Sequence, residues 1–549
     1  YVLPALKPGS YVLTFTSSDG VVRQTTVNVL LDQTARVDVE FDAKPADNTE
    51  IIEIVGTRIS RAGDSSINSS LGKDVLANVP SGQDYRSLLA IIPGVQYSEN
   101  STLGPSAGGS GRDNKYGFDG VDVSLPMYGN LASEPSTQDV AYVSIDRGGS
   151  KAIGFNRAGG ISVNTLSKSG TNDFHASIEY RIEPASLASD KKTTESSTET
   201  FEEDKTWFSA NMSGALIEDT LFFYGSYFGP EVTYDNKENA YGAVKQYNSE
   251  RDEYFGKLTW APTYDLLFNL SYRTSEKKTQ GESVNSFGAD STSEGSDVSQ
   301  DIFTLDGSYV LGDSTVLSFQ YSDFSNKNSG RPDTTFADVN PSIGGSLDIN
   351  NLAQQGNFFV PLVKTDEGYD NVTAQALIDA YGYDSGGTMV GGGNIGGGSY
   401  FNNQDFYRKS FELKLDHEME LGNTLHNIHL GFQWKENEEV LTRTSNGWGT
   451  INYIGGLNPD TPFETDTPIY YSASVYSNSL SEGELNPLTS SSENINIEVN
   501  DTIEHGDFTY NIGFMFSNDV LYGQGLKENS SNVSGYELAP GHKYKMYEL

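Results

Sequence analysis

The sequence of 549 residues contains no cysteine, which excludes disulfides, thiolate metal sites and cysteine nucleophiles. It also lacks any run approaching the roughly 18–20 apolar residues that a membrane-spanning helix requires. Closed β-barrels are the other structures that span a bilayer, and each of their strands gives only a weak apolar signal. The missing apolar run therefore does not exclude a membrane protein built from strands.

Basic residues are scarce. The chain has 36 Lys and Arg against 75 Asp and Glu, for a net charge of −39 and a pI near 4.3. Such a chain repels phosphate backbones, so we expect no nucleic-acid binding. The acidity has two interpretations, which the sequence leaves open: a solvated surface suited to a salty habitat, or calcium held by acidic surface loops. No other cofactor is predicted.

Motifs of common catalytic sites are missing as well. The sequence has no G-x-S-x-G, no Walker-type phosphate loop, no H-E-x-x-H and no G-x-G-x-x-G opening a helix. His426 and His429 lie three apart on a predicted strand, so they face opposite sides and make poor co-ligands. Asp119 and Asp122 in DGVD offer too few ligands for calcium and instead indicate a turn. We predict that the protein is not an enzyme and has no defined metal site.

Aromatic residues are plentiful by contrast. They make up 11% of the chain, with 32 Tyr and 27 Phe, although hydrophobic residues reach only 36% and mean hydropathy is −0.46. Disordered chains are poor in aromatics, so this combination favours many half-apolar strands. The stretch NDFHASIEYRIEP (172–184) shows the pattern. Ala176, Ile178, Tyr180 and Ile182 alternate with polar residues and would share one face of a strand.

About eleven such strands follow Phe174, most with one apolar face. Examples are Leu266/Phe268/Leu270/Tyr272, Phe303/Leu305/Tyr309/Leu311, Phe411/Leu413/Leu415 and Phe508/Tyr510/Ile512/Phe514/Phe516. Short turns alternate with long polar stretches at 184–204, 230–250, 274–300, 325–404 and 436–493. Nothing in a soluble β-sandwich requires short and long connections to alternate, whereas transmembrane barrels have short periplasmic turns and long extracellular loops. We predict a mainly β fold, a transmembrane antiparallel β-barrel with its apolar face toward lipid and its charged face toward a wet lumen.

The first 173 residues differ in character from the rest. Residues 1–45 alternate apolar and polar side chains around glycine turns, which predicts the end of a small β-sandwich. Residues 46–75 form a polar linker with one apolar pentad, and residues 76–173 form a compact α/β domain. The first barrel strand leaves this domain for the first long loop. The domain is therefore expected at the periplasmic end of the barrel or inside its lumen.

Several segments resemble a known family. AIIPGVQY, GFDGVDV and VAYVSIDRGGSKAIGFNRAGGISVNTLSKSGTNDFHASIEYR are similar to the plug domain of TonB-dependent outer-membrane transporters. KSGTNDFHAS is similar to the Oar-like subgroup, and LKPGSYVLTFTSSDG resembles the carboxypeptidase-regulatory-like domain that precedes the plug there, a module without catalytic residues. The resemblance implies an outer-membrane protein of a Gram-negative bacterium. Residues 76–173 would be the plug and 174–549 the first part of a 22-stranded barrel.

The resemblance also implies partners: a TonB-type energy-transducing protein, outer-membrane lipid and lipopolysaccharide, and an unidentified extracellular ligand. The TonB box of the family falls on the apolar pentad Ile51, Ile52, Glu53, Ile54 and Val55. There the pentad would pair as an added strand with the TonB-type protein. The alternative is an ordinary short strand of the neighbouring domain.

The plug's Arg-Gly and Gly-Gly pattern has counterparts here. The matching residues are Arg147, Gly148, Gly149, Gly159 and Gly160. Glycines allow tight turns and close backbone approach. The guanidinium of Arg147 would suit an ion pair with lumen carboxylates that locks the plug. We expect an architectural role for these residues.

The two longest loops are the predicted place of ligand contact, since long loops on a rigid scaffold often carry function. The first contains the glycine-rich run GGTMVGGGNIGGGSYF, which we expect to be flexible. Candidate stacking residues are Tyr381, Tyr383, Tyr400 and Phe401 in the first loop and Trp448, Tyr453, Tyr470 and Tyr471 in the second. The alternative is a mobile surface loop with incidental rings.

Energised uptake of a ligand is the function that these features predict. A structural, adhesive or secretion-associated surface role is the alternative, and the sequence does not name a substrate. The strands found here are about half of the family's 22, and the sequence begins within a strand, without a signal peptide. We therefore expect the sequence to be a piece of a longer chain.

Overall fold

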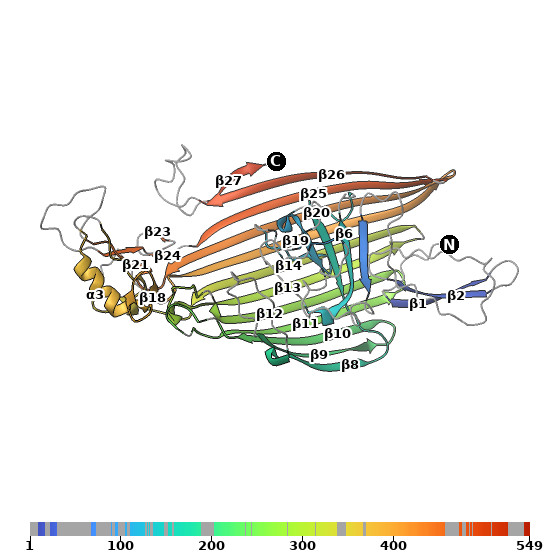
Figure 1. Cartoon of the computed structure of the whole chain (residues 1–549). Coiled ribbons are helices and arrows are strands. Elements are labelled where there is room, and N and C mark those ends of the chain that lie inside the picture. Colours follow the sequence, from blue (N-terminus) through green and yellow to red (C-terminus); the bar gives the residue numbers. More distant parts are fainter. Residues whose placement is uncertain are drawn as a thin grey trace.

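A computed structural model gives the architecture of the chain (Figure 1). It describes residues 9–16, 22–29, 67–72, 89, 94–96, 105–106, 110–126, 129, 131, 136–147, 152–155, 159–187, 203–236, 238–242, 244–282, 284–312, 314–337, 347–365, 369–455, 471–474, 479–481, 484–485, 487–506, 508–524 and 543–548. A curved sheet dominates the molecule, with smaller elements against its concave side and at both of its ends (Figure 1).

The large sheet has twelve antiparallel strands in the order β27-β26-β25-β20-β19-β14-β13-β12-β11-β10-β9-β8. Their bounds are β8 (His175–Glu183), β9 (Glu203–Ile217), β10 (Leu221–Tyr234), β11 (Tyr247–Thr263), β12 (Leu266–Glu282), β13 (Glu294–Leu311), β14 (Thr315–Pro332), β19 (Tyr400–Leu421), β20 (Thr424–Ser445), β25 (Leu488–His505), β26 (Phe508–Gln524) and β27 (Lys543–Glu548). Each strand pairs with the strands next to it in this order, and β8 and β27 form the two edges of the sheet. The mainly β, antiparallel barrel architecture is confirmed.

Alternation along the strands separates two environments. Outward side chains such as Leu270 and Ile497 keep 41% and 46% of their surface exposed, although they are aliphatic. Their neighbours on the inner face, such as Arg273 and Glu498, are almost completely buried. We call the outward apolar side chains the outer belt. Along β13 it runs from Phe303 to Leu311, about 26 Å at 3.3 Å per residue, which after strand tilt is close to the apolar band of membrane barrels.

The inner face differs from the wet lumen that the sequence predicted. Lys257, Arg273 and Glu498 are buried there because the preceding domain fills the curve of the sheet. The strands are also longer than their apolar segments: β19 and β20 have 22 residues each. The strands continue beyond the outer belt with polar side chains on both faces, so the loops are shorter than the polar stretches of the sequence.

The predicted plug contains a five-stranded sheet in the order β3-β6-β7-β4-β5. Its strands are β3 (Ile67–Gly72), β4 (Lys115–Phe118), β5 (Val121–Asp122), β6 (Val140–Arg147) and β7 (Ile161–Ser167). Because β3 pairs with β6, residues 67–72 belong to this sheet, and not to the linker in which the sequence analysis placed them. A two-residue turn, Asp119-Gly120, joins β4 to β5 with positive φ at both positions.

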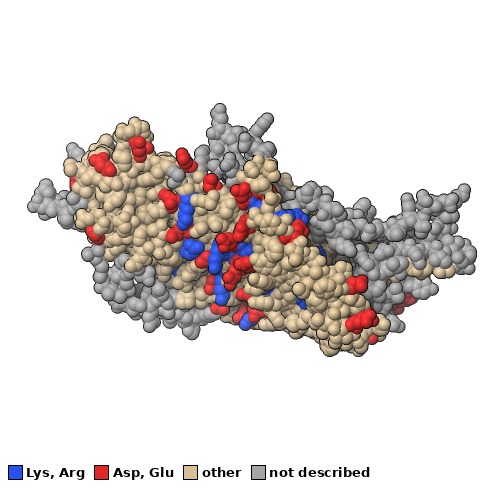
Figure 2. All heavy atoms as spheres, turned by 90° about the horizontal axis from the view of Figure 1, so that it is seen from below, with Lys and Arg blue, Asp and Glu red and all other residues tan. Residues whose placement is uncertain are grey.

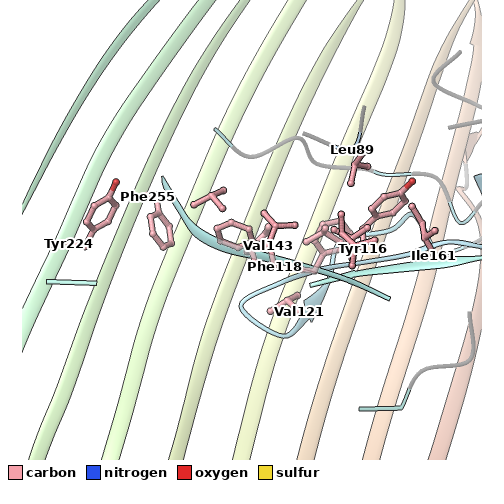
Figure 3. Close-up of a cluster of buried hydrophobic side chains, with 14 residues drawn as sticks. Leu89, Tyr116, Phe118, Val121, Val143, Ile161, Tyr224 and Phe255 are labelled. Carbon is pink, nitrogen blue, oxygen red and sulfur yellow. The ribbon is translucent and has the colours of Figure 1, made fainter. Parts of the chain in front are cut away.

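One hydrophobic core joins the plug to the barrel wall (Figure 3). Leu89, Tyr116, Phe118, Val143 and Ile161 of the plug lie in the same cluster as wall residues. The wall side chains are Tyr224, Phe255, Ile302 and Phe324, all on the inner face of β10, β11, β13 and β14. The plug therefore lies inside the curve of the sheet.

A small folded unit covers one end of the sheet. It contains α3 (Asn371–Tyr381) and a four-stranded sheet in the order β18-β15-β21-β22. The strands of this sheet are β15 (Asn357–Phe359), β18 (Asn394–Gly396), β21 (Thr450–Tyr453) and β22 (Tyr471–Ser474). Two separate hairpins accompany it: β16 (Tyr383–Asp384) with β17 (Met389–Val390), and β23 (Ser479–Ser481) with β24 (Glu484–Leu485), the latter in the same loop as β22. We call residues 347–365, 369–399, 446–455 and 471–474 the loop cap. Since its segments come from the two longest loops, we expect this end to be the extracellular one.

The other end carries the short turns and the hairpin of β1 (Gly9–Thr16) and β2 (Val22–Val29) (Figure 1). The predicted β-sandwich of residues 1–45 is described only as this hairpin and stays a prediction. Among the described residues, no helix has the length and apolar character needed to cross a membrane.

Replacing a belt residue by a cation tests the membrane-facing assignment. We expect Leu270→Arg to lower the free energy of unfolding in lipid bilayers by about 2–4 kcal/mol, because the guanidinium would enter hydrocarbon. Glu276→Arg is the matched control, since it lies outward on the same strand beyond the belt, where the cost is about 0–1 kcal/mol. Denaturant titration of the protein in vesicles measures both. Equal effects would contradict the assignment.

Candidate functional site

A buried arginine joins the plug to the barrel wall. The guanidinium of Arg273 on β12 lies 4.4 Å from the ring centre of Phe118 and 4.5 Å from that of Phe255, one ring from the plug and one from the wall. Its Nη2 is 3.2 Å from Oδ2 of Asp139, and its Nη1 pairs with Glu253. Asp139 ends the short helix η2 (Thr137–Asp139). Two carboxylates and two ring faces thus surround one cation, which offsets its loss of hydration.

The same contact has further hydrogen bonds. The backbone N–H of Ser136 donates to Glu253 over 3.2 Å, and the Tyr224 hydroxyl donates to Asp139 over 2.9 Å. Burial raises the pKa of the Asp139 carboxyl, and the positive charge of Arg273 opposes this shift. The helix η2 is therefore held at both of its ends by side chains of β10 and β11.

A second contact holds the β4–β5 hairpin of the plug. Nη1 of Arg408 on β19 donates to the carbonyl oxygens of Asp122 and Ser124 over 2.6 and 2.9 Å and lies 3.2 Å from the Asp122 carboxylate. Burial alone would raise the pKa of Asp122, but the positive charges of Arg408, Lys435 and Lys115 outweigh it and lower the pKa to about 2. Asp122 is thus ionised at physiological pH.

A third contact holds the plug loop 152–155. The Glu498 carboxylate on β25 accepts hydrogen bonds from the backbone N–H groups of Gly154 and Phe155, over 2.8 and 2.9 Å. His429 lies between Glu498 and Asp416, 2.9 and 2.7 Å from them. Gly154 and Phe155 both have positive φ, which is uncommon for a bulky residue such as Phe155. A wall carboxylate therefore holds a strained turn of the plug.

The predicted plug residues lie beside this loop. Arg147 is the last residue of β6 and pairs in register with Ile161, but its side chain, Gly148 and Gly149 lie outside the described residues. Gly160 is buried, and a Cβ there would lie 2.4 Å from the Asn114 side-chain oxygen, whereas Gly159 is exposed with only ordinary contacts. Close approach of the backbone therefore accounts for Gly160. The ion pair of Arg147 stays a prediction.

Sequence reasoning missed the three wall residues that hold the plug. Arg273, Arg408 and Glu498 are charged residues on inner-face positions, where many other polar residues also lie. Their neighbours in the sequence carry no motif. Only the fold shows that these three face the plug backbone and its carboxylates.

The loop cap has a hydrophobic core of its own. Its buried residues are Leu352, Phe358, Val360, Ala374, Leu377, Ile378, Ile395, Ile451 and Tyr453. Several predicted ligand residues pack in or against this core: Tyr381 contacts Phe358 with ring centres 5.6 Å apart, and Tyr453 contacts Tyr471 at 5.4 Å. Trp448 packs against it as well. These rings therefore contribute to the folding of the cap, and ligand stacking by them stays a prediction.

The other predicted ligand residues are spread over the cap and its base. Tyr383 contacts Tyr241 and Phe287, whose loops join β10 to β11 and β12 to β13. Tyr400 and Phe401 open β19, where the strand leaves the cap. Tyr470 and the pentad Ile51–Val55 lie outside the described residues. The described loop candidates are thus divided between the core of the cap and its base.

The glycine-rich run differs from the flexible segment that the sequence predicted. A Cβ at Gly391 would lie 1.8 Å from the carbonyl oxygen of Pro361, and one at Gly396 would lie 1.9 Å from that of Gly356. These glycines are needed for close contact between backbones. The run is packed into the cap, where side chains would not fit.

Calcium in the acidic loops stays a prediction. Within the described part of the chain, no group of three or more His, Asp or Glu side chains has an arrangement that could hold a metal ion.

Comparison with known proteins shows which proteins this chain resembles. No family model matches the chain. The sequence is 28% identical over 250 residues to the TonB-dependent transporter Oar of Myxococcus xanthus, an alignment that covers 42% of this chain and 23% of Oar. Over this alignment the chain is similar to a TonB-dependent transporter. The predicted location in the outer membrane of a Gram-negative bacterium agrees with this relationship.

Solved structures share the fold. The outer membrane transporter YddB of Escherichia coli superposes with a TM-score of 0.59 at 12% identity, over 83% of this chain and 57% of YddB. The ferric citrate transporter FecA superposes with a TM-score of 0.54 at 12% identity, over 88% of this chain and 58% of FecA. The chain spans less than two thirds of each of these relatives.

The Asp122 contact predicts how the plug responds to acid. Because the pKa of Asp122 is lowered from 3.8 to about 2, its ionised form stabilises the docked plug above pH 4. That contribution, about 2 kcal/mol, is lost as the pH falls from 4 through 2. We expect Asp122→Asn to remove this part of the pH dependence, measured by hydrogen exchange of plug amides between pH 5 and 2. An unchanged profile in Asp122→Asn would contradict the assignment, with Glu276→Gln on the outer face as control.

The packed glycines predict a rigid cap. Gly396 and Gly386 both have positive φ, but a Cβ at Gly386 would meet nothing within 4 Å. We expect Gly386→Ala to cost about 1–2 kcal/mol from backbone strain alone. Gly396→Ala should cost a further 1–3 kcal/mol from overpacking. Hydrogen exchange of the amides in α3 measures the stability of the cap, and equal costs would show that the run is not closely packed.

Proposed function

We propose that the chain is the plug and part of the barrel of a receptor that takes up a ligand across the outer membrane, with energy from a TonB-type protein. One observation carries the proposal: a separately folded domain lies inside the curve of the membrane-facing sheet and is held there by Arg273, Arg408 and Glu498. A barrel with only a structural role needs no such domain in its lumen.

The contacts suit a plug that is stable at rest and can still be displaced. Arg273, Arg408 and Glu498 bind through ion pairs and hydrogen bonds, which water can replace when the plug moves. Among the described residues, the buried hydrophobic contact between plug and wall forms one cluster. We infer that force on the N-terminal side of the plug separates these contacts in turn.

The ligand would approach from the side of the loop cap. Because the cap is folded around its own core, we infer that it presents fixed surfaces at the entrance. FecA is a ferric citrate transporter, but at 12% identity the likeness concerns the fold, so the chemical class of the ligand is open.

A structural, adhesive or secretion-associated role is the second candidate. Exposed aliphatic side chains on the cap favour it: Val372, Val363 and Leu362 are exposed although they lie on a folded unit. Such side chains suit contact with another surface. In that case the cap would carry the function without any pull on the plug.

Strand addition by the pentad Ile51–Val55 separates the two candidates. Proline at Ile52 removes a backbone donor and is not tolerated within a paired strand. We expect the wild-type protein to bind the purified periplasmic domain of the TonB-type protein and Ile52→Pro to lose that binding. Ser60→Pro, in the same linker, is the matched control and should bind normally. Binding that is equal in all three proteins would remove the uptake proposal and leave the surface role.

A further inference from the structure

A shallow groove opens on the outer face of the barrel wall. It has a volume of about 420 Å³ and is lined by Tyr272, Asp301, Phe303, Tyr321, Asp323 and Ser325. Register places these side chains on one face, since Tyr272 pairs with Phe303, and Phe303 with Asp323. This is the outward face, because the alternate residues, such as Arg273 and Phe324, are buried under the plug.

The groove lies at the extracellular edge of the outer belt. On one side of the groove, the cross-strand pair Leu270 and Leu305 belongs to the outer belt. On the other side, the paired residues Glu276, Ser299 and Lys327 are polar or charged. Seen from below, Lys, Arg, Asp and Glu gather in a stripe across the molecule, and the surface on either side of the stripe carries few charges (Figure 2). The groove thus lies where hydrocarbon gives way to lipid head groups.

Two carboxylates face this boundary without a cation of the chain. The Tyr272 hydroxyl donates to Asp301 over 2.6 Å. Within the described residues, no hydrogen bond or ion pair reaches the carboxylate of Asp323. Lys409 is its cross-strand neighbour in register, but the ammonium lies beyond ion-pair distance. Carboxylates next to hydrocarbon are costly unless a positive charge accompanies them.

We propose that this groove binds a membrane amphiphile with an ammonium head group. The ammonium would lie between the carboxylates of Asp301 and Asp323, against the rings of Phe303 and Tyr321. Ring faces attract cations, and more strongly where water is excluded. The acyl chain would extend along Leu270 and Leu305 into the bilayer. The groove is large enough, since small-molecule sites measure about 300–1,000 Å³.

A metal ion that bridges to an anionic lipid fits less well. Calcium takes 6–8 oxygen ligands, and the groove offers two carboxylates, one of them already bonded to Tyr272. Two carboxylates with aromatic rings between them match an ammonium ion better than a calcium ion. The bound amphiphile would also support the strand that carries the plug contact, because Tyr272 precedes Arg273 on β12.

Binding of dodecylammonium to the purified chain in neutral detergent tests the proposal, with dodecyl sulfate as the anionic comparison and native mass spectrometry as the readout. We expect the double variant Asp301→Asn, Asp323→Asn to bind dodecylammonium roughly tenfold more weakly, a change of about 1.4 kcal/mol. Lys409→Gln should bind it more tightly, since a competing ammonium is removed. Dodecyl sulfate should bind all variants equally.

The matched control is Glu276→Gln, Asp405→Asn, which removes two outward carboxylates beyond the groove and leaves the groove intact. It should bind dodecylammonium within about twofold of the wild type, which is below the effect of one charge pair. Equal weakening in both double variants would reduce the effect to net charge and overturn the site. Binding that requires added calcium and is lost with a chelator would overturn the ammonium assignment. Unchanged binding in the groove variant would overturn the proposal.

Discussion

Alternation along the strands is the constraint on which the structure depends. A sheet that faces hydrocarbon must satisfy its backbone groups within itself and turn apolar side chains outward. Every second residue then faces inward, and in this chain many of those residues are polar or charged. The outer belt and the charged inner wall are therefore two results of one pattern, and neither can change without the other.

The inner wall in turn requires the plug. Arg273 and Glu498 are nearly inaccessible, so their charges have lost most of their hydration. Asp139 and the backbone of residues 154–155 replace the missing water. A plug held by polar contacts can be stable at rest and still be pulled away from the wall, because water can replace each hydrogen bond or ion pair. This property links the electrostatics of the wall to the proposed uptake.

The loop cap follows a different principle from the barrel. Its stability comes from a small hydrophobic core and from glycines that let backbones touch. Aromatic residues that looked like free ligand contacts in the sequence, such as Tyr381 and Tyr453, are part of that core. A rigid cap would offer a ligand fixed surfaces only.

The sequence by itself determined the class of fold and the positions of most strands, because a period of two residues is a local property that each segment displays on its own. The similarity of residues 90–97, 117–123 and 140–181 to plug sequences was also readable there. Only the tertiary structure decided that β3 joins the plug, that the glycine-rich run is packed, and that Arg273, Arg408 and Glu498 hold the plug. Those outcomes depend on which distant segments meet, and a charged residue on an inner face has the same local pattern whether it meets water or a partner.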